Sequence, residues 1–313
     1  MLKKLLNFYG RLDEAIFFAI DFELKHYYIS PLKSIDEDIL FSIEEKSNFK
    51  NKKIPYSKKA VSFKRYKKAF ETIIKEIKKG NTYLLNLTFP SIIDIDYSLK
   101  EIYLYSDAKY KLCFKDKFVC FSPETFIEIK DDKIYTYPMK GTIDANIKNA
   151  KEIIMSDEKE MAEHTMVVDL LRNDLGIIAK HIRVEKFRYA EKIKAGEREL
   201  LQISSKISGE LQKNWNERLG DILLSLLPAG SISGTPKKST VSIIKKVENY
   251  NRGYFSGVFG VYKNKTLKSA VMIRFIEKQG DKLFYKSGGG ITIESDVNKE
   301  YQELQDKIYV PFL

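Results

Sequence analysis

Residues 155–176, MSDEKEMAEHTMVVDLLRNDLG, read as one long helix around which the rest of the chain can be placed. Ser156 or Asp157 can cap its first turn, and acidic residues gather in its first half, where the helix dipole favours them. Apolar residues recur at helical spacing and predict a buried face: Ala162, Met166, Val167, Leu170 and Leu171. Gly176 is suited to a left-handed conformation that ends the helix.

Glu163 is the unusual residue of this helix, because it lies on or beside the predicted packing face. A carboxylate there is costly unless it is paired or holds a metal ion. The helix alone therefore leaves two interpretations open. Glu163 is either a rim residue paired with a nearby lysine or a metal ligand.

Composition indicates a globular protein with a large core. The chain has 313 residues, 43% of them hydrophobic, and a mean hydropathy of −0.32. No apolar run approaches the roughly 20 residues of a membrane span, and the N-terminus lacks the apolar core of a signal peptide. Cys113 and Cys120 are isolated, which fits a reducing compartment. We predict a cytoplasmic protein with no membrane partner.

The net charge of +11 raises nucleic acid as a partner. The lysines are scattered among acidic residues, however, and no arginine-rich or aromatic-basic motif occurs. We therefore predict no nucleic-acid partner and a surface that modestly favours an anionic substrate.

Pairs of strand-like segments alternate with helical ones, and few have the short spacing of a parallel β-α-β unit. This pattern predicts an α+β fold with antiparallel sheets. Residues 1–55 are predicted as a short N-terminal portion that contributes strands, and 56–313 as the main domain. Strands are predicted at 15–20, 26–29, 83–89 (closed by Pro90), 111–121, 126–129, 134–137, 257–262, 270–276 and 282–285. Helices are predicted at 63–80, 155–175, 217–227, 239–247 and 296–309, the last capped by Ser295.

Two short motifs at strand ends could carry acid–base or nucleophilic chemistry. Glu124 follows Ser122 and Pro123 between two strands, and Lys140 is followed by Gly141 and Thr142. Taken singly, each is more often an ordinary turn residue. As a nucleophile near pH 7, Lys140 would need its pKa lowered by roughly 3 units, about 4 kcal/mol, through burial or nearby cations.

Two glycine-containing segments could bind an anion. The loop 227–237, LPAGSISGTPK, can bring backbone N–H groups against a ligand but does not have the spacing of a Walker A loop. Three glycines, 288–290, precede a helix on which Glu300, Glu303 and Lys307 share one face. Arg274 lies within the apolar run 270–276 and needs an acidic partner or an anionic ligand there.

These residues suit a small dianionic substrate. Glu163 and Glu303 could hold Mg²⁺, Arg274 and Lys307 could hold carboxylates, and Glu124 and Lys140 could act as acid and nucleophile or base. No single fragment decides this interpretation.

In order and spacing, the motifs together make the chain resemble the chorismate-utilising enzymes, from about residue 63 to residue 307. The motifs are GNTYLLNLT (80–88), SPETF (122–126), PMKGT (138–142), AEHTMVVDLLRNDLG (162–176), GSISGTPK (230–237), GVFG (257–260), IR (273–274), GGGI (288–291) and EYQE (300–303). The resemblance implies an orthogonally packed antiparallel β-sandwich with helices on its outer faces. It implies Mg²⁺ bound by Glu163 and Glu303, with Glu300 as a helper. It also implies that chorismate is contacted by Gly141, Thr142, Ser231, Gly234, Tyr254, Arg274, Gly288, Gly289 and Lys307.

Lys140 discriminates among members of this family. Anthranilate and isochorismate synthases resemble one another in having alanine at this place, whereas the aminodeoxychorismate synthases have lysine. The resemblance then implies that Lys140 attacks the ring at C2, that Glu124 protonates the departing 4-hydroxyl, and that ammonia adds at C4. Neither cysteine lies in a Gly-x-Cys-x-Gly turn, so a separate glutamine amidotransferase subunit is the expected source of ammonia. Anthranilate synthase is the alternative, followed by isochorismate or salicylate synthase and a non-catalytic polyanion-binding protein.

The chain departs from the family pattern in three places. Gln202 stands where the family usually has a histidine, and Ile143-Asp144-Ala145 replaces a usual Pro-Arg after Gly-Thr. The N-terminal portion is also shorter than in typical members, which puts a tryptophan site or feedback control in doubt.

Overall fold

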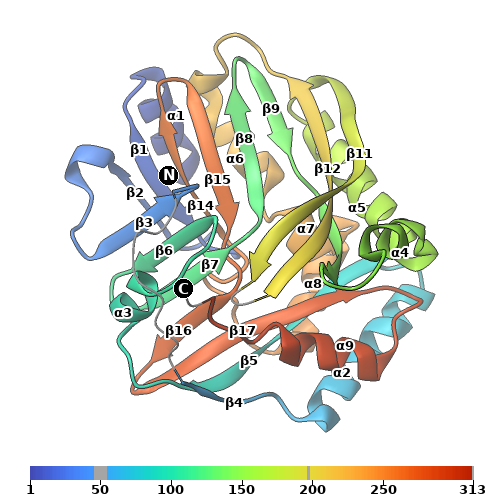
Figure 1. Cartoon of the computed structure of the whole chain (residues 1–313). Coiled ribbons are helices and arrows are strands. Elements are labelled where there is room, and N and C mark those ends of the chain that lie inside the picture. Colours follow the sequence, from blue (N-terminus) through green and yellow to red (C-terminus); the bar gives the residue numbers. More distant parts are fainter. Residues whose placement is uncertain (46–54, 196–197, 312–313) are drawn as a thin grey trace.

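The fold consists of two antiparallel β-sheets that cross one another, with helices on their outer faces (Figure 1). A computed structural model describes residues 1–45, 55–195 and 198–311. In Figure 1 the strands of the first sheet run up the page and those of the second run across it. The α+β sandwich predicted from the sequence is therefore confirmed.

The first sheet has the strand order β10-β12-β9-β8-β15-β14-β1-β2, with β11 paired to β12. Its N-terminal strands join it directly, because β1 pairs with both β14 and β2. The bounds are β1 Ile16–Ile20, β2 Tyr27–Pro31, β8 Thr125–Lys130, β9 Lys133–Thr136, β10 Met139–Asp144, β11 Lys180–Ala195, β12 Arg198–Glu210, β14 Val258–Lys263 and β15 Thr266–Val271.

The second sheet has the order β13-β5-β17-β16-β7-β6-β3, with β4 paired to β5. The bounds are β3 Ile39–Ile43, β4 Ser57–Lys59, β5 Leu84–Asp94, β6 Tyr110–Phe114, β7 Phe118–Ser122, β13 Gly234–Thr235, β16 Phe275–Gln279 and β17 Lys282–Ile291. Apolar side chains of both sheets meet in a shared cluster, in which Phe17 and Phe259 of the first sheet join Phe118 and Phe275 of the second. This cluster holds the two sheets face to face.

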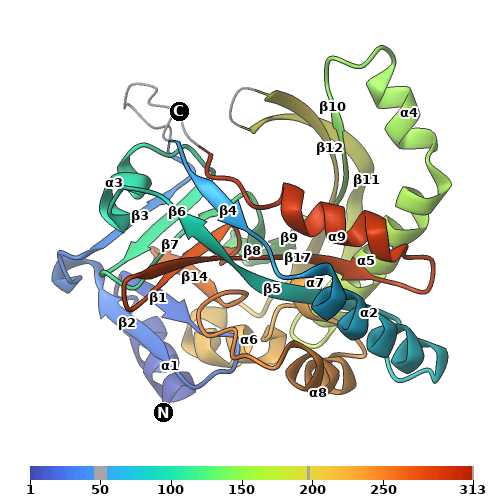
Figure 2. The same ribbon diagram turned by 90° about the horizontal axis from the view of Figure 1, so that it is seen from below.

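Helices cover the outer faces and bring site residues to one end of the second sheet. In Figure 2, α2 and α9 lie next to β5 and β17, and α5 packs against β10, β11 and β12. The bounds are α1 Leu2–Arg11, α2 Phe63–Lys78, α3 Leu99–Leu104, α4 Ala150–Ser156, α5 Glu158–Gly176, α6 Leu219–Leu226, α7 Gly230–Ser233, α8 Lys237–Glu248 and α9 Val297–Asp306, with 3₁₀ turns at Leu32–Ser34 and Trp215–Arg218.

The long helix differs from the prediction at both ends and on its buried face. Met155 and Ser156 belong to α4, and Asp157 caps α5 by accepting a hydrogen bond from the backbone N–H of Glu160. The helix ends at Gly176 and the following residue, Ile177, keeps a right-handed conformation, so Gly176 is not a left-handed cap. Ala162 and Met166, predicted to be buried, are exposed. The helix packs against β10, β11, β12 and α7, and its buried residues are Glu163, His164, Val167, Val168, Leu170, Asp174 and Leu175.

Three strand and cap predictions were also wrong. Pro90 does not close β5, which continues to Asp94. At Pro90 the strand pairs with Lys286 of β17, while β13 and β4 cover only its two ends on the other side, so the missing N–H costs no ladder bond. The run 270–276 breaks between β15 and β16, and Arg274 lies in the break with a φ of 51°. The last helix ends at Asp306 and is capped by Asp296 rather than Ser295.

Candidate functional site

Glu124 lies in the turn between β7 and β8, where the Ser122 hydroxyl accepts a hydrogen bond from its backbone N–H at 3.1 Å. The hydroxyl of Ser231, the second residue of α7, donates a hydrogen bond to the Glu124 carboxyl group. Burial raises the pKa of Glu124, and this outweighs the hydrogen bond from Ser231 and the attraction of three cations. The cations are Arg274, Lys140 and Lys307. Glu124 is therefore suited to hold a proton and act as a general acid.

Lys140 projects from β10 toward α5, and its Nζ donates to Glu163 Oε2 at 3.3 Å. Glu163 is 9% exposed and is also paired with Lys159 at 3.7 Å. Burial lowers the pKa of Lys140, but Glu163 and Glu303 outweigh burial and hold it above its usual value. The resting amine is thus charged. A ligand or ion that neutralises Glu163 and Glu303 would remove the cause of the raised pKa of Lys140.

The helix α9 supplies two further carboxylates and a lysine. Lys307 Nζ pairs with Glu303 and donates to the Gly288 carbonyl at 3.0 Å. Glu300 Oε1 accepts from Ser295 at 2.8 Å, whereas its buried Oε2 has no hydrogen-bond partner among the described residues. Burial raises the pKa of Glu300, as do Glu303 and Glu163, so the three carboxylates lie within electrostatic reach of one another.

The three glycines form a bare stretch of β17 beneath these side chains. A methyl group built on Gly289 would lie 3.1 Å from Glu303 Oε1 and 3.5 Å from Glu300 Oε2. One built on Gly290 would lie 3.2 Å from Lys140 Nζ. The strand β16 pairs with β17 only up to Lys286, so backbone groups of the glycines face the site on that side. The absence of side chains here makes room for a ligand against the backbone.

The three carboxylates fit Mg²⁺ by donor chemistry, because Mg²⁺ prefers oxygen ligands and retains several waters. The unpartnered Oε2 of Glu300 is a spare acceptor of this kind. Within residues 1–45, 55–195 and 198–311, however, no three His, Cys, Asp or Glu converge closely enough to hold a metal ion. Lys140 and Lys307 pair with Glu163 and Glu303 instead. Mg²⁺ stays a prediction.

Arg274 enters the site from the break before β16. Its carbonyl accepts from the Phe121 N–H at 3.1 Å, and its guanidinium lies 5.3 Å from the ring centre of Tyr309. The buried Nε has no hydrogen-bond partner within the parts of the chain that the structure describes. A guanidinium with a free donor beside Glu124, Lys140 and Lys307 can bind an organic carboxylate.

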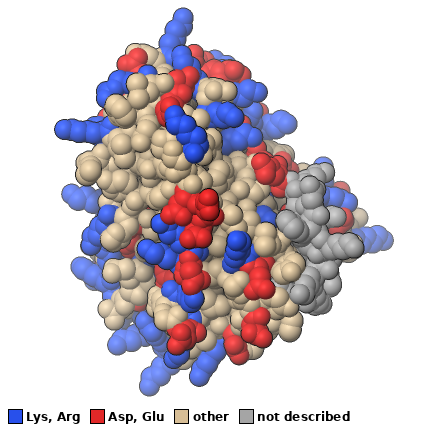
Figure 3. Space-filling view, turned by 90° about the vertical axis from the view of Figure 1, so that its left-hand side faces the viewer, with Lys and Arg blue, Asp and Glu red and all other residues tan. Residues whose placement is uncertain are grey.

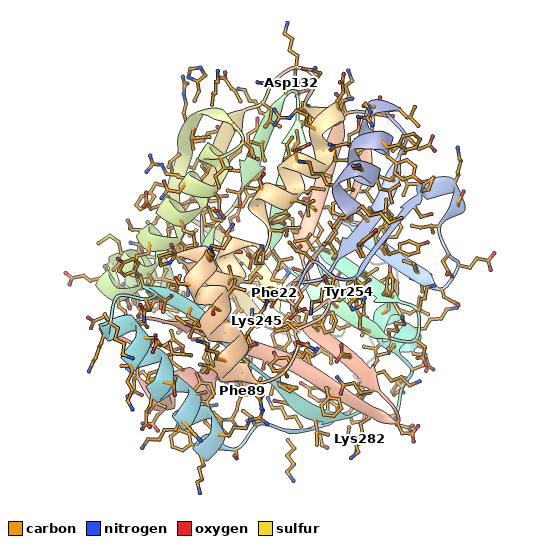
Figure 4. All side chains as sticks on the ribbon, turned by 180° about the vertical axis from the view of Figure 1, so that it is seen from behind. Phe22, Phe89, Asp132, Lys245, Tyr254 and Lys282 are labelled. Carbon is orange, nitrogen blue, oxygen red and sulfur yellow. The ribbon has the colours of Figure 1, made fainter. Side chains whose placement is uncertain are left out.

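The structure thus brings together Glu124, Lys140, Glu163, Ser231, Arg274, Gly288, Gly289, Glu300, Glu303 and Lys307. Tyr254 lies elsewhere, with its ring 5.3 Å from that of Phe114 and 5.1 Å from that of Phe118, beside the N-terminal strands (Figure 4). Thr142 is exposed opposite Gln202 on β12.

At two of the predicted site positions, Gly234 and Gly141, the backbone conformation itself explains why the residue is glycine. Gly234 has a φ of 127°, and a methyl group there would lie 1.9 Å from the Leu84 carbonyl. Gly141 has a φ of 83°. Both backbone conformations favour glycine whatever the ligand.

Sequence reasoning gave no role to two residues that organise the site. The Asn86 side chain donates to the Ser231 carbonyl at 3.0 Å. Arg252 is fully buried and pairs with Glu248. In the sequence, Asn86 is marked only as a polar residue within the apolar run LLNL, and Arg252 only as the partner of Glu248 four residues earlier.

A small cavity of about 20 Å³ adjoins Glu124 and Ser231 and extends to Leu171 and Asp174 of α5. A cavity of this size has room for about one molecule as small as water.

The family model for "chorismate binding enzyme" matches residues 18–312. The chain belongs to this family. A protein of Haemophilus influenzae named "Uncharacterized PabA-like protein" is 47% identical over 97% of this chain and 94% of its own length. The "Aminodeoxychorismate synthase component 1" of Bacillus subtilis is 30% identical, covering 78% of this chain and 54% of that protein. The crystal structure of anthranilate synthase component I from Streptococcus pneumoniae matches with a TM-score of 0.70 and 26% identity, over 82% of this chain and 58% of that chain.

The surface face in Figure 3 carries lysines and arginines interspersed with acidic residues over several elements. None of the helices in the described parts of the chain is long and apolar enough to cross a membrane.

Proposed function

We propose that this chorismate-binding enzyme is the amination component of an aminodeoxychorismate synthase, with Lys140 as nucleophile and Glu124 as general acid. The observation that carries the proposal is the Lys140 amine, which lies over the bare backbone at Gly290, within electrostatic reach of a carboxyl group suited to hold a proton. A side-chain amine at this place offers a covalent route that an aliphatic side chain does not.

The proposed reaction has two displacements. Lys140 Nζ, once deprotonated, bonds to C2 of the ring, both ring double bonds shift by one position, and the C4–O bond breaks. Glu124 gives its proton to the departing hydroxyl, which leaves as water. The nitrogen of ammonia then bonds to C4, both double bonds shift back, and the C2–N bond to Lys140 breaks. One proton of the added nitrogen returns to Glu124. The sum is chorismate plus ammonia giving 4-amino-4-deoxychorismate plus water.

The remaining residues bind and orient the dianion. Arg274 and Lys307 supply two cations beside the glycine backbone, which would fix the carboxylates and the ring relative to Lys140. Glu163 and Glu303, with Glu300 behind them, would hold Mg²⁺, whose charge would assist in binding a substrate carboxylate.

Ammonia is expected from a separate glutamine amidotransferase subunit. Both cysteines are buried, and burial raises the pKa of Cys113 to about 12 and that of Cys120 further, so neither is a thiolate nucleophile. The cavity beside Glu124 is large enough for a molecule of the size of ammonia.

Product analysis tests the proposal. The purified protein is incubated with chorismate, Mg²⁺ and an ammonium salt, and the product is identified by mass spectrometry. We expect 4-amino-4-deoxychorismate. Anthranilate, isochorismate, salicylate or an absence of turnover would overturn the assignment.

Intact-protein mass spectrometry without ammonia tests the nucleophile. The wild type should gain the mass of chorismate less water, and Lys140→Ala should not. Lys206→Ala is the matched control, because Lys206 is a similarly half-buried, ion-paired lysine on β12, where it meets Glu185 at 2.7 Å. An undiminished adduct in Lys140→Ala would reject Lys140 as the nucleophile.

A further inference from the structure

Asn86 is a polar residue in the middle of an apolar strand, and its side chain reaches across to the loop that holds the acid. Leu85 and Leu87 on either side are fully buried. The Asn86 amide nitrogen donates to the Ser231 carbonyl at 3.0 Å, and the hydroxyl of the same serine donates to Glu124. Ser231 thus accepts a hydrogen bond from Asn86 through its backbone carbonyl and donates one to Glu124 through its hydroxyl.

The backbone on both sides of this contact is held by one buried cation. Arg252 donates to the Asn86 carbonyl at 2.7 Å and to the Ile232 carbonyl at 3.0 Å, and it pairs with Glu248. Because the side chains of Arg252 and Glu248 are 1% and 0% exposed, this connection between β5 and α7 is rigid. Asn86 therefore projects from a fixed backbone.

Asn86 also faces the nucleophile. It pairs in register with Gly290 on β17. The methyl position on Gly290 lies 3.2 Å from Lys140 Nζ and 3.9 Å from Asn86 Oδ1. The Asn86 side chain therefore contacts the loop that orients Glu124, and both it and Lys140 Nζ lie close to Gly290.

We propose that Asn86 is a positioning residue: its side-chain amide fixes Ser231, keeps the Ser231 hydroxyl on Glu124, and so sets the acid relative to Lys140. The assignment of acid and nucleophile rests on the proposed function. The linkage from Asn86 through Ser231 to Glu124 is a property of this chain whatever its product.

The linkage has a measurable electrostatic consequence. The Ser231 hydrogen bond lowers the pKa of Glu124, as do the cations Arg274, Lys140 and Lys307. Asp174 lines the same cavity but is paired with Lys237 at 3.1 Å. Without the Asn86 amide, the Ser231 carbonyl loses the hydrogen bond that orients it, although Arg252 still holds the Ile232 carbonyl. The Ser231 hydroxyl then turns away from Glu124, and the pKa of Glu124 rises further.

The first test measures Glu124 directly in the resting protein. Glutamate carboxyl carbons are labelled with ¹³C, and the Glu124 signal is the one that Glu124→Gln removes. Asn86→Leu, which matches the shape without a donor, should raise the pKa of Glu124 as much as Ser231→Ala does. The double variant should raise it no further. Asn216→Leu is the control, because Asn216 is a buried asparagine whose amide donates to the Gly10 carbonyl at 2.8 Å, far from the site in the chain's first helix.

The second test is kinetic and follows chorismate consumption. Asn86→Leu should lower kcat about a hundredfold, as expected for a misplacement of about 1 Å. KM for chorismate should change little, because the substrate carboxylates are proposed to be bound by Arg274 and Lys307 and not by Asn86. Asn216→Leu should keep the wild-type rate. The double variant with Ser231→Ala should be no slower than Ser231→Ala alone.

A pKa of Glu124 that stays at its wild-type value in Asn86→Leu overturns the inference, as do rate losses that multiply in the double variant. These outcomes are independent of the product. If the wild type makes anthranilate, or consumes no chorismate, the proposed function fails while the Glu124 titration still decides the role of Asn86.

Discussion

Replacing Gly290 by alanine should separate stability from activity. The added methyl would lie 3.1 Å from Leu84 Cδ1 and 3.2 Å from Lys140 Nζ, and both are the far ends of flexible side chains. Gly290 has an ordinary negative φ within β17, so alanine fits its backbone and lowers the entropy of the unfolded chain. That effect stabilises by roughly 0.4–1 kcal/mol. Relief of the close contacts requires Lys140 to withdraw by about 0.5 Å, since relaxed contacts lie at about 3.5–4.0 Å.

A displacement of about 1 Å at a reacting group costs about a hundredfold in rate, so one of half that size should cost about tenfold. We therefore expect Gly290→Ala to melt at or slightly above the wild-type temperature and to form the Lys140–chorismate adduct about ten times more slowly. Thermal unfolding and rapid-quench intact-protein mass spectrometry measure the two quantities.

Gly288→Ala is the matched contrast on the same strand. Its methyl would lie 2.0 Å from the Leu87 carbonyl, which is backbone and cannot turn aside. This variant should lose stability. Adduct formation at the wild-type rate in Gly290→Ala would show that Lys140 does not work over Gly290 and would refute the reasoning, as would a loss of stability equal to that of Gly288→Ala.

Three further predictions concern stability. Glu124→Gln should raise the melting temperature at neutral pH but not well below pH 4.5, the ordinary glutamate pKa. The native pKa of Glu124 is raised, so the wild type loses stability as pH rises through it, and a gain that persists in acid would contradict this. Arg252→Met should lower the free energy of unfolding in urea by about 3–5 kcal/mol, because it leaves Glu248 buried and unpaired; a loss below about 1 kcal/mol would show that Glu248 is not confined there. Mg²⁺ at about a hundred times its Kd should stabilise the wild type by about 2.7 kcal/mol and Glu303→Gln much less, whereas equal shifts would place the ion elsewhere.

The parts of the fold that sequence predicts well are those in which apolar periodicity reports burial. The helix α2 was found because its apolar stripe faces the core. The run 111–121 was recognised as extended because all residues of β6 and β7 are buried, but the turn at 115–117 that divides it into two strands was missed. The long hairpin of β11 and β12 was missed because its first strand carries alternating charged residues and is largely exposed. The face of α5 was misjudged because the residues it buries against β10 and β12 include Glu163 and His164, which periodicity counts as polar.

The candidate site shows a similar division. Residues in short motifs, such as Lys140 and Glu124, could be named because their neighbours along the chain mark them. Asn86 and Arg252 could not be given a role, since the carbonyl groups that they bind, those of Ser231 and Asn86, lie far away in sequence and only the folded structure reveals them. The interpretation of Glu163 as lysine-paired or metal-binding needed the fold as well, and the structure now shows the lysine pairing with Lys140.

The first 45 residues complete both sheets, which has a consequence for engineering. The strands β1 and β2 cover β14 in one sheet, and β3 covers β6 in the other. A fragment starting at residue 56 would leave β14 and β6 as bare strand edges, templates on which a second chain can add. Such a truncation should aggregate even though every residue proposed for chemistry is retained. A design that transfers the candidate site to another scaffold must therefore include strands or other elements that cover the exposed edges of β14 and β6.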